Sequence, residues 1–230
     1  KWMNKPTLVL IPGLLCDDSV WEYQSAVLKR YANIIIPDVA TLQNADAVIK
    51  FILDESPPTF YLAGHSMGGW LALELMREHA QRVTKLCILA SSASLDSAEK
   101  TRLRQECLQL FSTISKDEMA EYLAELYAYS PRILPLVKNM FKRNMDAFVP
   151  QQEAMMQRLS CEGILPTIKV PTTVIVGEED TEFFSGSKFI ADQTHNATFI
   201  ALKQCGHMIT LEQPQECAEA LLTWLQAPML

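Results

Sequence analysis

The sequence lacks several features that would place it in whole classes of protein. No apolar run approaches the roughly 20 residues that a membrane-spanning helix needs, so no membrane span is predicted. Positive charge is in deficit, because 20 Lys and Arg residues face 27 Asp and Glu residues and the net charge is −7. Phosphate binding needs a clustered positive surface, and this balance therefore argues against a nucleic-acid partner.

The sequence also shows no cluster of metal ligands and no cysteine pattern that predicts disulfide bonds. The six cysteines are scattered and form no C-x-x-C pair. A zinc site would need Cys and His close together, so no metal site is predicted. The chain is long enough to bury a core without disulfide bonds, so the scattered cysteines are expected to be reduced, buried side chains. The start also lacks the apolar stretch of a secretory leader. A cytoplasmic protein is expected, with Met3 as a candidate natural start after Lys1 and Trp2.

Strand and helix signals alternate along the chain, and this rhythm predicts the fold class. Short apolar runs typical of strands buried on both faces fall at 7–11, 33–37, 60–63, 83–90, 172–176 and 198–202. Helical patterns lie between most of them, and the last helix is expected to begin at Pro214. The alternation predicts an α/β fold with a mostly parallel sheet of about six strands flanked by helices.

The rhythm stops between residues 95 and 162, where every pattern is helical. The segment is too long for a connection, so it is predicted to be an all-helical lid inserted into a core made of 1–94 and 163–230. Its methionines and phenylalanines would suit varied apolar ligands, although ordinary core packing explains them as well. A small or medium, uncharged apolar acyl group is expected, with Met145 and Phe148 as candidate substrate-binding residues.

The predicted lid also carries a basic stretch, made of Arg132, Lys138, Lys142 and Arg143. Such a stretch is usually a solvated helix face. It could instead bind an acidic acyl carrier, such as an acyl carrier protein or the phosphates of coenzyme A. Both interpretations stay open at this stage.

The motif with the clearest chemistry is G-x-S-x-G at residues 64–68, between a predicted strand and a predicted helix. A serine on such a tight turn is strained, and the flanking glycines give strand and helix room to approach. The hydroxyl then lies at a helix N-terminus, which favours developing negative charge. Ser66 is therefore the predicted nucleophile. An incidental serine in a glycine-rich turn is the alternative, whereas a nucleotide loop is disfavoured because G-x-G-x-x-G and Walker patterns are absent.

A serine nucleophile needs a base, and four histidines compete for that role. His207 follows the last predicted strand, and active-site groups gather at the carboxyl ends of parallel strands. His65 lies inside the elbow, where its side chain is expected to point away from Ser66. His79 and His195 lie in polar stretches. These positions make His207 the predicted base.

The base needs an orienting carboxylate, and Glu178, Glu179 and Asp180 follow the strand at 172–176. The chain order Ser, acid, His fits all three. Asp180 lies furthest into the loop and is preferred. Asp96, after the fourth strand, is expected to cap a helix.

The negative oxygen of the tetrahedral intermediate also needs donors. The residue after the nucleophile, Met67, can supply its backbone N–H, and the loop after the first strand can supply a second. The backbone N–H of Leu14 is the predicted second donor of this oxyanion hole.

These segments resemble the α/β-hydrolase superfamily along nearly the whole chain. The resemblance is carried by Ile11-Pro12-Gly13-Leu14, by Gly64 to Gly69, by Gly177 to Asp180 and by Gly206 to Pro214. Pro12 stands where the family usually has His, which implies a different support for the oxyanion loop. The family's leading hairpin is also expected to be missing.

The resemblance implies a cofactor-independent serine esterase or thioesterase with the triad Ser66, Asp180 and His207, acting through an acyl-enzyme on a small-molecule substrate. The fold alone does not select the substrate. A carbon–carbon lyase or eliminating synthase would use the same triad but would need polar groups in the pocket to hold an acidic substrate. A non-catalytic receptor on this fold would need no serine and histidine together.

Overall fold

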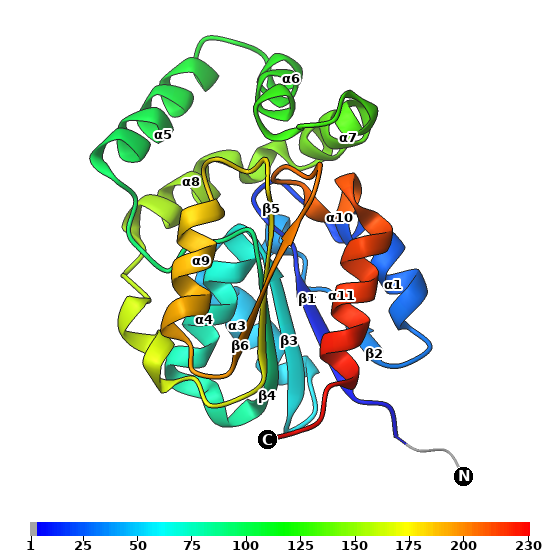
Figure 1. Ribbon diagram of the computed structural model, residues 1–230. Helices are drawn as coiled ribbons and strands as arrows, with labels where there is room; N and C mark the ends of the chain where they lie inside the picture. Colours follow the sequence, from blue (N-terminus) through cyan, green and yellow to red (C-terminus); the bar gives the residue numbers. More distant parts are fainter. Residues whose placement is uncertain (1–3) are drawn as a thin grey trace.

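A computed structural model describes residues 4–230, so the candidate start at Met3 lies outside the described residues. One parallel sheet runs in the order β2-β1-β3-β4-β5-β6 (Figure 1). Its strands are β1 (Thr7–Ile11), β2 (Asn33–Ile35), β3 (Phe60–His65), β4 (Val83–Leu89), β5 (Thr172–Gly177) and β6 (Ala197–Leu202). Each falls at a predicted position, and the six-stranded α/β fold is confirmed.

The apolar runs form central strands because they can bury both of their faces. Successive side chains of a strand point to opposite sides of the sheet. In β1, Leu8 and Leu10 join one buried cluster, whereas Val9 and Ile11 join the other. The sheet therefore separates two cores, each of which a helical layer must cover.

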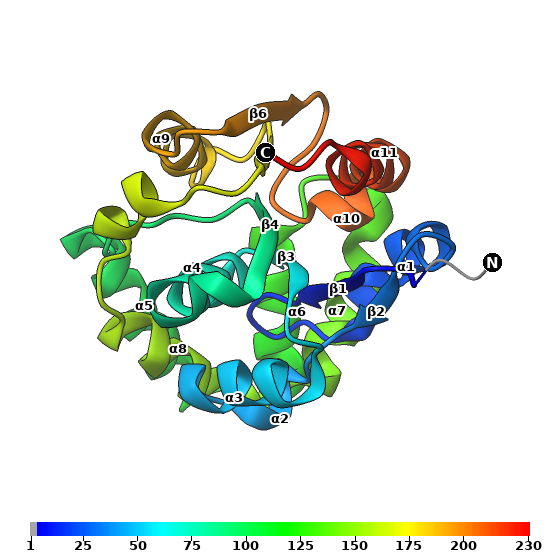
Figure 2. The same ribbon diagram turned by 90° about the horizontal axis from the view of Figure 1, so that it is seen from below.

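Helices cover both faces of the sheet (Figure 2). On one face α1 (Glu22–Leu28) packs against α11 (Pro214–Gln226), with the short α10 (Ile209–Glu212) beside it. The other face carries α3 (Ala45–Glu55), α4 (Met67–His79) and α9 (Phe184–Gln193), and the short α2 (Val39–Leu42) precedes α3. The last helix begins at Pro214, as predicted.

All of the chain between β4 and β5 is helical or irregular. Residues 95–162, called the helical insert below, contain α5 (Ala98–Phe111), α6 (Lys116–Tyr127), α7 (Leu134–Arg143) and α8 (Phe148–Gln157). In Figure 1 these helices lie across the carboxyl ends of the strands, where the loops after β1, β3, β5 and β6 emerge. Single 3₁₀ turns at Asp18–Trp21, Ala80–Arg82, Pro131–Ile133, Met145–Ala147 and Glu162–Thr167 complete the helical elements.

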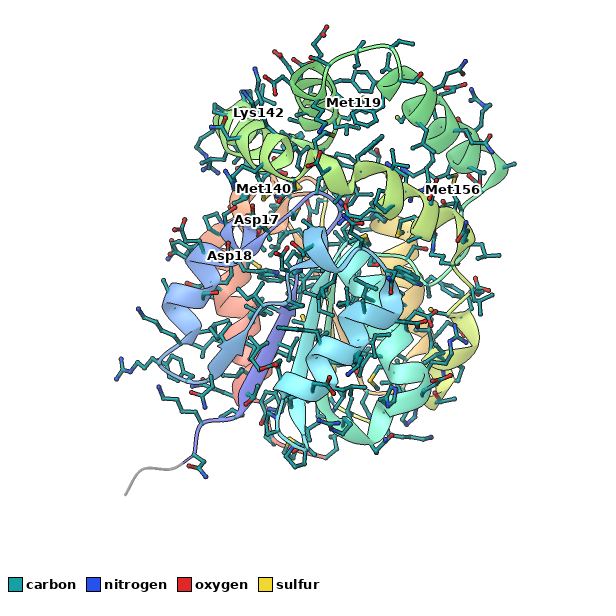
Figure 3. The ribbon with its side chains drawn as sticks, turned by 180° about the vertical axis from the view of Figure 1, so that it is seen from behind. Asp17, Asp18, Met119, Met140, Lys142 and Met156 are labelled. Atoms are coloured by element: carbon teal, nitrogen blue, oxygen red, sulfur yellow. The ribbon has the colours of Figure 1, made fainter. Side chains whose placement is uncertain are left out.

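The basic stretch of the helical insert is matched by partners within the chain. Arg143 pairs with Asp17 on the loop after β1 at 3.1 Å, and Figure 3 shows Asp17 and Lys142 on the same side of the molecule. Lys142 and Lys138 pair with acids of α6, and Arg132 donates to backbone carbonyls of α10. These cations therefore hold the insert together and tie it to the core.

Two further observations concern the described residues as a whole. All six cysteines are free thiols, and five of them are buried. Among residues 4–230, no helix combines the length and apolarity that crossing a membrane requires.

Candidate active site

Ser66 lies directly between β3 and α4, in a conformation that side chains rarely adopt. Its φ is 58° and its ψ is −119°, a strained region for a residue with a Cβ, worth on the order of 1–3 kcal/mol. Its N–H donates to the Leu89 carbonyl at 2.8 Å, and its own carbonyl accepts from the Ser91 hydroxyl at 2.8 Å. Bonds to β4 and to the loop that follows it therefore hold the strained residue in place.

Glycines allow the backbones around Ser66 to approach closely. A Cβ at Gly64 would lie 2.1 Å from the Gly68 carbonyl oxygen, and one at Gly68 would lie 2.3 Å from that of Ile11. No side chain fits at either position, so the G-x-S-x-G pattern has a steric cause here.

The three residues predicted as a triad lie in one chain of hydrogen bonds. His207 Nδ1 is 2.8 Å from Asp180 Oδ2, and His207 Nε2 is 2.9 Å from Ser66 Oγ. Because a carboxylate only accepts, Nδ1 carries the proton and Nε2 is left to accept from the Ser66 hydroxyl. The arrangement can remove a proton from Ser66 as it attacks.

Asp180 is the only one of the three competing acids that reaches the base. It is 5% exposed, whereas Glu178 and Glu179 are exposed. Its Oδ1 accepts from the Phe183 amide at 3.1 Å, which fixes the carboxylate. Burial by itself would raise the pKa of Asp180, but the hydrogen bond and charge of His207 outweigh it, and the pKa lies below its usual value. The acid therefore stays ionised.

The two predicted oxyanion donors both line the pocket. Within residues 4–230, the amides of Leu14 and Met67 donate to no other group. The next residue, Leu15, has a φ of 60°, and its N–H donates to Gln151 Oε1 of α8 at 2.9 Å. The helical insert therefore supports this loop, which begins at Pro12. The sequence carried no signal for Gln151, because the two segments are far apart in the chain.

His65 forms no side-chain hydrogen bond with Ser66 among residues 4–230 and instead contacts His207. Its Nε2–H donates to the His207 carbonyl at 2.8 Å, and the two rings lie 5.1 Å apart. The side chain is buried and its Nδ1 has no partner among the described residues. Burial, together with the nearby His207, lowers the pKa of His65 to about 3. His65 is thus a neutral support for the loop that carries the base.

His65 is expected to make folding stability depend on pH. A histidine whose pKa falls from 6.5 to about 3 on folding binds a proton more readily in the unfolded chain, so stability drops as the pH falls below 6.5. Between pH 7 and pH 5 this residue should account for a loss of about 2 kcal/mol. Urea unfolding of His65→Gln should show a correspondingly shallower pH dependence, with the exposed-site variant His195→Gln as control. Equal slopes for His65→Gln and the wild type would contradict this assignment.

Glu212 joins the helical insert to the loop that carries the base. Its Oε1 accepts from the Ser130 amide at 2.5 Å and its Oε2 accepts from the Gly206 amide at 2.9 Å. The residue is 4% exposed. Burial raises the pKa of Glu212 more than these amide bonds lower it. One carboxylate therefore satisfies two backbone donors from distant segments.

Glu212→Gln should lose one of these bonds. The side-chain NH2 of Gln would face one of the two backbone N–H groups, and both are hydrogen-bond donors. We expect a loss of about 1–3 kcal/mol in the free energy of unfolding, typical of hydrogen bonds to a charged acceptor. Denaturant unfolding measures it, and Glu216→Gln on the exposed side of α11 is the matched control. If both variants are equally stable, Glu212 does not bridge the two segments.

A pocket of about 460 Å³ lies over Ser66 and His207. Its wall combines the loops after β1, β3, β4, β5 and β6 with residues of the helical insert. The insert contributes Tyr127, Phe141 and Met155, among others, and Phe183 stacks on the His207 ring at 4.7 Å. The predicted base, His207, therefore lies beside apolar side chains in the pocket wall.

Met145 and Phe148, the candidate substrate-binding residues, are not in this wall. They are 1% and 0% exposed and belong to the same buried cluster as Leu8 and Leu10 of β1, and Phe148 meets Phe111 edge to face at 5.1 Å. They were proposed from the methionine and phenylalanine content of the insert, which does not distinguish a packed core from a cavity wall. Asp96 also differs from expectation, because Ser97 caps α5 and Asp96 pairs with Arg104 and Arg158.

Comparison with known proteins identifies a family, relatives in sequence and a similar solved structure. The chain matches the description "Alpha/beta hydrolase family" over residues 8–220. It is 24% identical to monoacylglycerol lipase ABHD6 of Homo sapiens, over 96% of this chain and 76% of that protein. It is also 24% identical to a 2-hydroxy-6-oxononadienedioate/2-hydroxy-6-oxononatrienedioate hydrolase of a Pseudomonas species, over 72% of this chain and 62% of that protein. The solved enol-lactonase of Burkholderia xenovorans LB400 superposes with a TM-score of 0.84 at 20% identity, covering 98% of this chain and 93% of the other.

Proposed function

The chain belongs to the alpha/beta hydrolase family, and on this premise we propose that it cleaves a carboxylic ester or thioester through an acyl-enzyme, without a cofactor. The observation that carries the proposal is the hydrogen-bonded chain Ser66–His207–Asp180, of which Ser66 and His207 line the pocket. A lipase relative and a structurally similar lactonase support ester chemistry.

The proposed reaction assigns a role to each of these residues. The Ser66 hydroxyl attacks the carbonyl carbon while His207 Nε2 takes its proton, and the charge on Asp180 stabilises the imidazolium that forms. The amides of Leu14 and Met67 stabilise the negative oxygen. His207 then gives the proton to the leaving alcohol or thiol. Water then attacks the acyl carbon while His207 takes its proton, and His207 returns this proton to Ser66 Oγ as the acid is released.

The helical insert is proposed to act as a lid that shapes the acyl pocket. Apolar side chains of the core, Met67 and Trp70, face those of the insert, Phe141 and Met155, around the same cavity. Such a wall suits the methylenes of a small or medium acyl chain. Opening would require the insert to shift against its ties to the core, among them the pairs Lys100–Glu182 and Arg143–Asp17.

Met155→Ala should therefore change the preference for acyl chain length. Enlarging the cavity is expected to favour octanoate over acetate esters by several-fold, since each buried methylene is worth about 0.8 kcal/mol. The measurement is kcat/KM for p-nitrophenyl acetate, butyrate and octanoate. Met145→Ala is the matched control, because Met145 is buried outside the pocket, and it should lower stability without changing the ratio. The same ratio in Met155→Ala and the wild type would contradict the lid's role.

A second candidate is the hydrolysis of a carbon–carbon bond in an acidic substrate. It is favoured by the buried arginines Arg104 and Arg158 in the pocket wall, and one relative is named as a hydrolase of dicarboxylate compounds. The two reactions are separated by measuring turnover of p-nitrophenyl esters and acyl thioesters and, in parallel, turnover of a vinylogous diketo acid. The ester proposal expects turnover of the esters or thioesters. Exclusive turnover of the diketo acid would replace it, and no turnover of any kind would favour a receptor.

A further inference from the structure

Three charged side chains that the proposed reaction does not use lie together in the pocket wall. Arg104 Nε donates to Asp96 Oδ2 at 2.7 Å, and Arg158 Nη2 donates to Asp96 Oδ1 at 2.8 Å. The three side chains are only 5–9% exposed. All three line the cavity that contains Ser66. Two buried guanidinium groups thus share a single carboxylate.

This trio carries one positive charge in excess. Burial would raise the pKa of Asp96, but the hydrogen bonds from Arg158 and Arg104 hold it below its usual value, so the carboxylate is ionised. Guanidinium groups do not deprotonate in proteins. The other charged groups of the wall do not compensate, since Lys100 is paired with Glu182 and Glu99 is exposed. A buried charge without a counter-charge is unfavourable, and an anionic ligand would balance it.

Arg104 is the member of the trio with the most unused donors. Its Nε donates to Asp96 and its Nη1 donates to Gln152 Oε1 at 2.7 Å. Its Nη2, with two N–H groups, donates to no residue between 4 and 230. Arg158, in contrast, uses both Nη groups on Asp96 and on backbone carbonyls. Arg158 keeps single unused N–H groups on Nε and Nη1, so among residues 4–230 the one complete NH2 group of the cluster that donates to no residue is Nη2 of Arg104.

We propose that Arg104 binds a terminal carboxylate on the acyl group, so that the substrate is a monoester or monothioester of a dicarboxylic acid. This inference rests on the proposed function. One excess charge matches one carboxylate rather than a phosphate dianion, and the planar guanidinium suits its geometry. The carboxylate is placed on the acyl side because the acyl group must stay bound while the alcohol leaves. The uncharged acyl group expected from sequence rested on methionine content, which does not reveal this cluster.

The test compares charged and neutral substrates of equal length. The probes are p-nitrophenyl monoesters of succinic, glutaric and adipic acids, each beside its ω-methyl ester. The wild type should show a higher kcat/KM for the free carboxylate at one or more of these lengths. Arg104→Gln should lower the charged-to-neutral ratio by about 10- to 100-fold, the value of a hydrogen bond to a charged group. The ratio is the measurement, because damage to the fold would lower kcat/KM for both substrates alike.

Arg102→Gln is the matched control. It removes the same charge from the same helix, but Arg102 is exposed and pairs with Glu106 outside the pocket, so the ratio should not change. A preference for the neutral ester at all three lengths, or an unchanged ratio in Arg104→Gln, would overturn the inference.

If no ester is turned over, the proposed function is wrong. The proposed carboxylate site at Arg104 is then tested by ligand binding instead of by kinetics. Calorimetric titration with glutarate should show binding to the wild type that is lost in Arg104→Gln. Absence of binding to the wild type, or equal binding to both proteins, would overturn the anion site.

Discussion

Ser66→Ala is expected to lower kcat for p-nitrophenyl esters by at least about three orders of magnitude, because no other residue can form the acyl-enzyme. The fold should persist, since the bonds that hold this residue involve its backbone N–H and carbonyl, which Ala retains. Circular dichroism and urea unfolding would show this. Ser66→Gly should be as inactive yet relieve the strain at φ 58°, so it is expected to be no less stable than Ser66→Ala.

The matched control is Ser92→Ala. Ser92 lines the same pocket, but within residues 4–230 its hydroxyl contacts only the backbone of Ser94 and no histidine. Its substitution should change kcat by less than about ten-fold, as for a residue outside the reacting atoms. A large loss in Ser92→Ala beside a small loss in Ser66→Ala would reverse the assignment.

Asp180→Asn should cut kcat by up to about 10⁴-fold while the protein stays folded. The amide of Asn can donate to His207 Nδ1, which favours the tautomer that carries its proton on Nε2. That tautomer cannot accept from Ser66 Oγ at 2.9 Å. The loss should appear in kcat for every acyl length, because the proton transfer is common to all of them.

Glu179→Gln is the control for Asp180→Asn. Glu179 is the exposed neighbour on the same turn, and its substitution should leave kcat within a few-fold of the wild type. Kinetics of both variants on one ester are sufficient. If Glu179→Gln is crippling and Asp180→Asn is mild, the orienting acid has been misassigned.

The strand positions and the proximity of Ser66, His207 and Asp180 were predictable because their signals are local in the sequence. Ser66 follows from a five-residue motif with a steric cause, and His207 follows from its place after the last strand. Among the three acids, depth in the loop pointed to Asp180, and the 2.8 Å contact with His207 explains the choice. Strand positions were predictable because each central strand buries both faces and so reads as a continuous apolar run.

What could not be predicted depends on contacts between distant segments. Gln151 reaches Leu15 across 136 positions, and Arg158 reaches Asp96 across 62. Nothing in either local pattern distinguishes these residues from solvated ones. Met145 and Met155 are likewise both apolar residues of the insert and both buried, yet only Met155 borders the cavity. Burial is visible in a sequence, whereas the choice between core and cavity depends on how helices pack.

The measurement that tests the central claim most directly is capture of the acyl-enzyme. Wild-type protein is mixed with p-nitrophenyl butyrate, quenched in acid within the first turnovers, digested and examined by mass spectrometry. A butyryl group on the peptide that contains Ser66 is expected, and it should be absent in Ser66→Ala. A butyryl group on another residue, or full ester turnover by Ser66→Ala, would contradict the account.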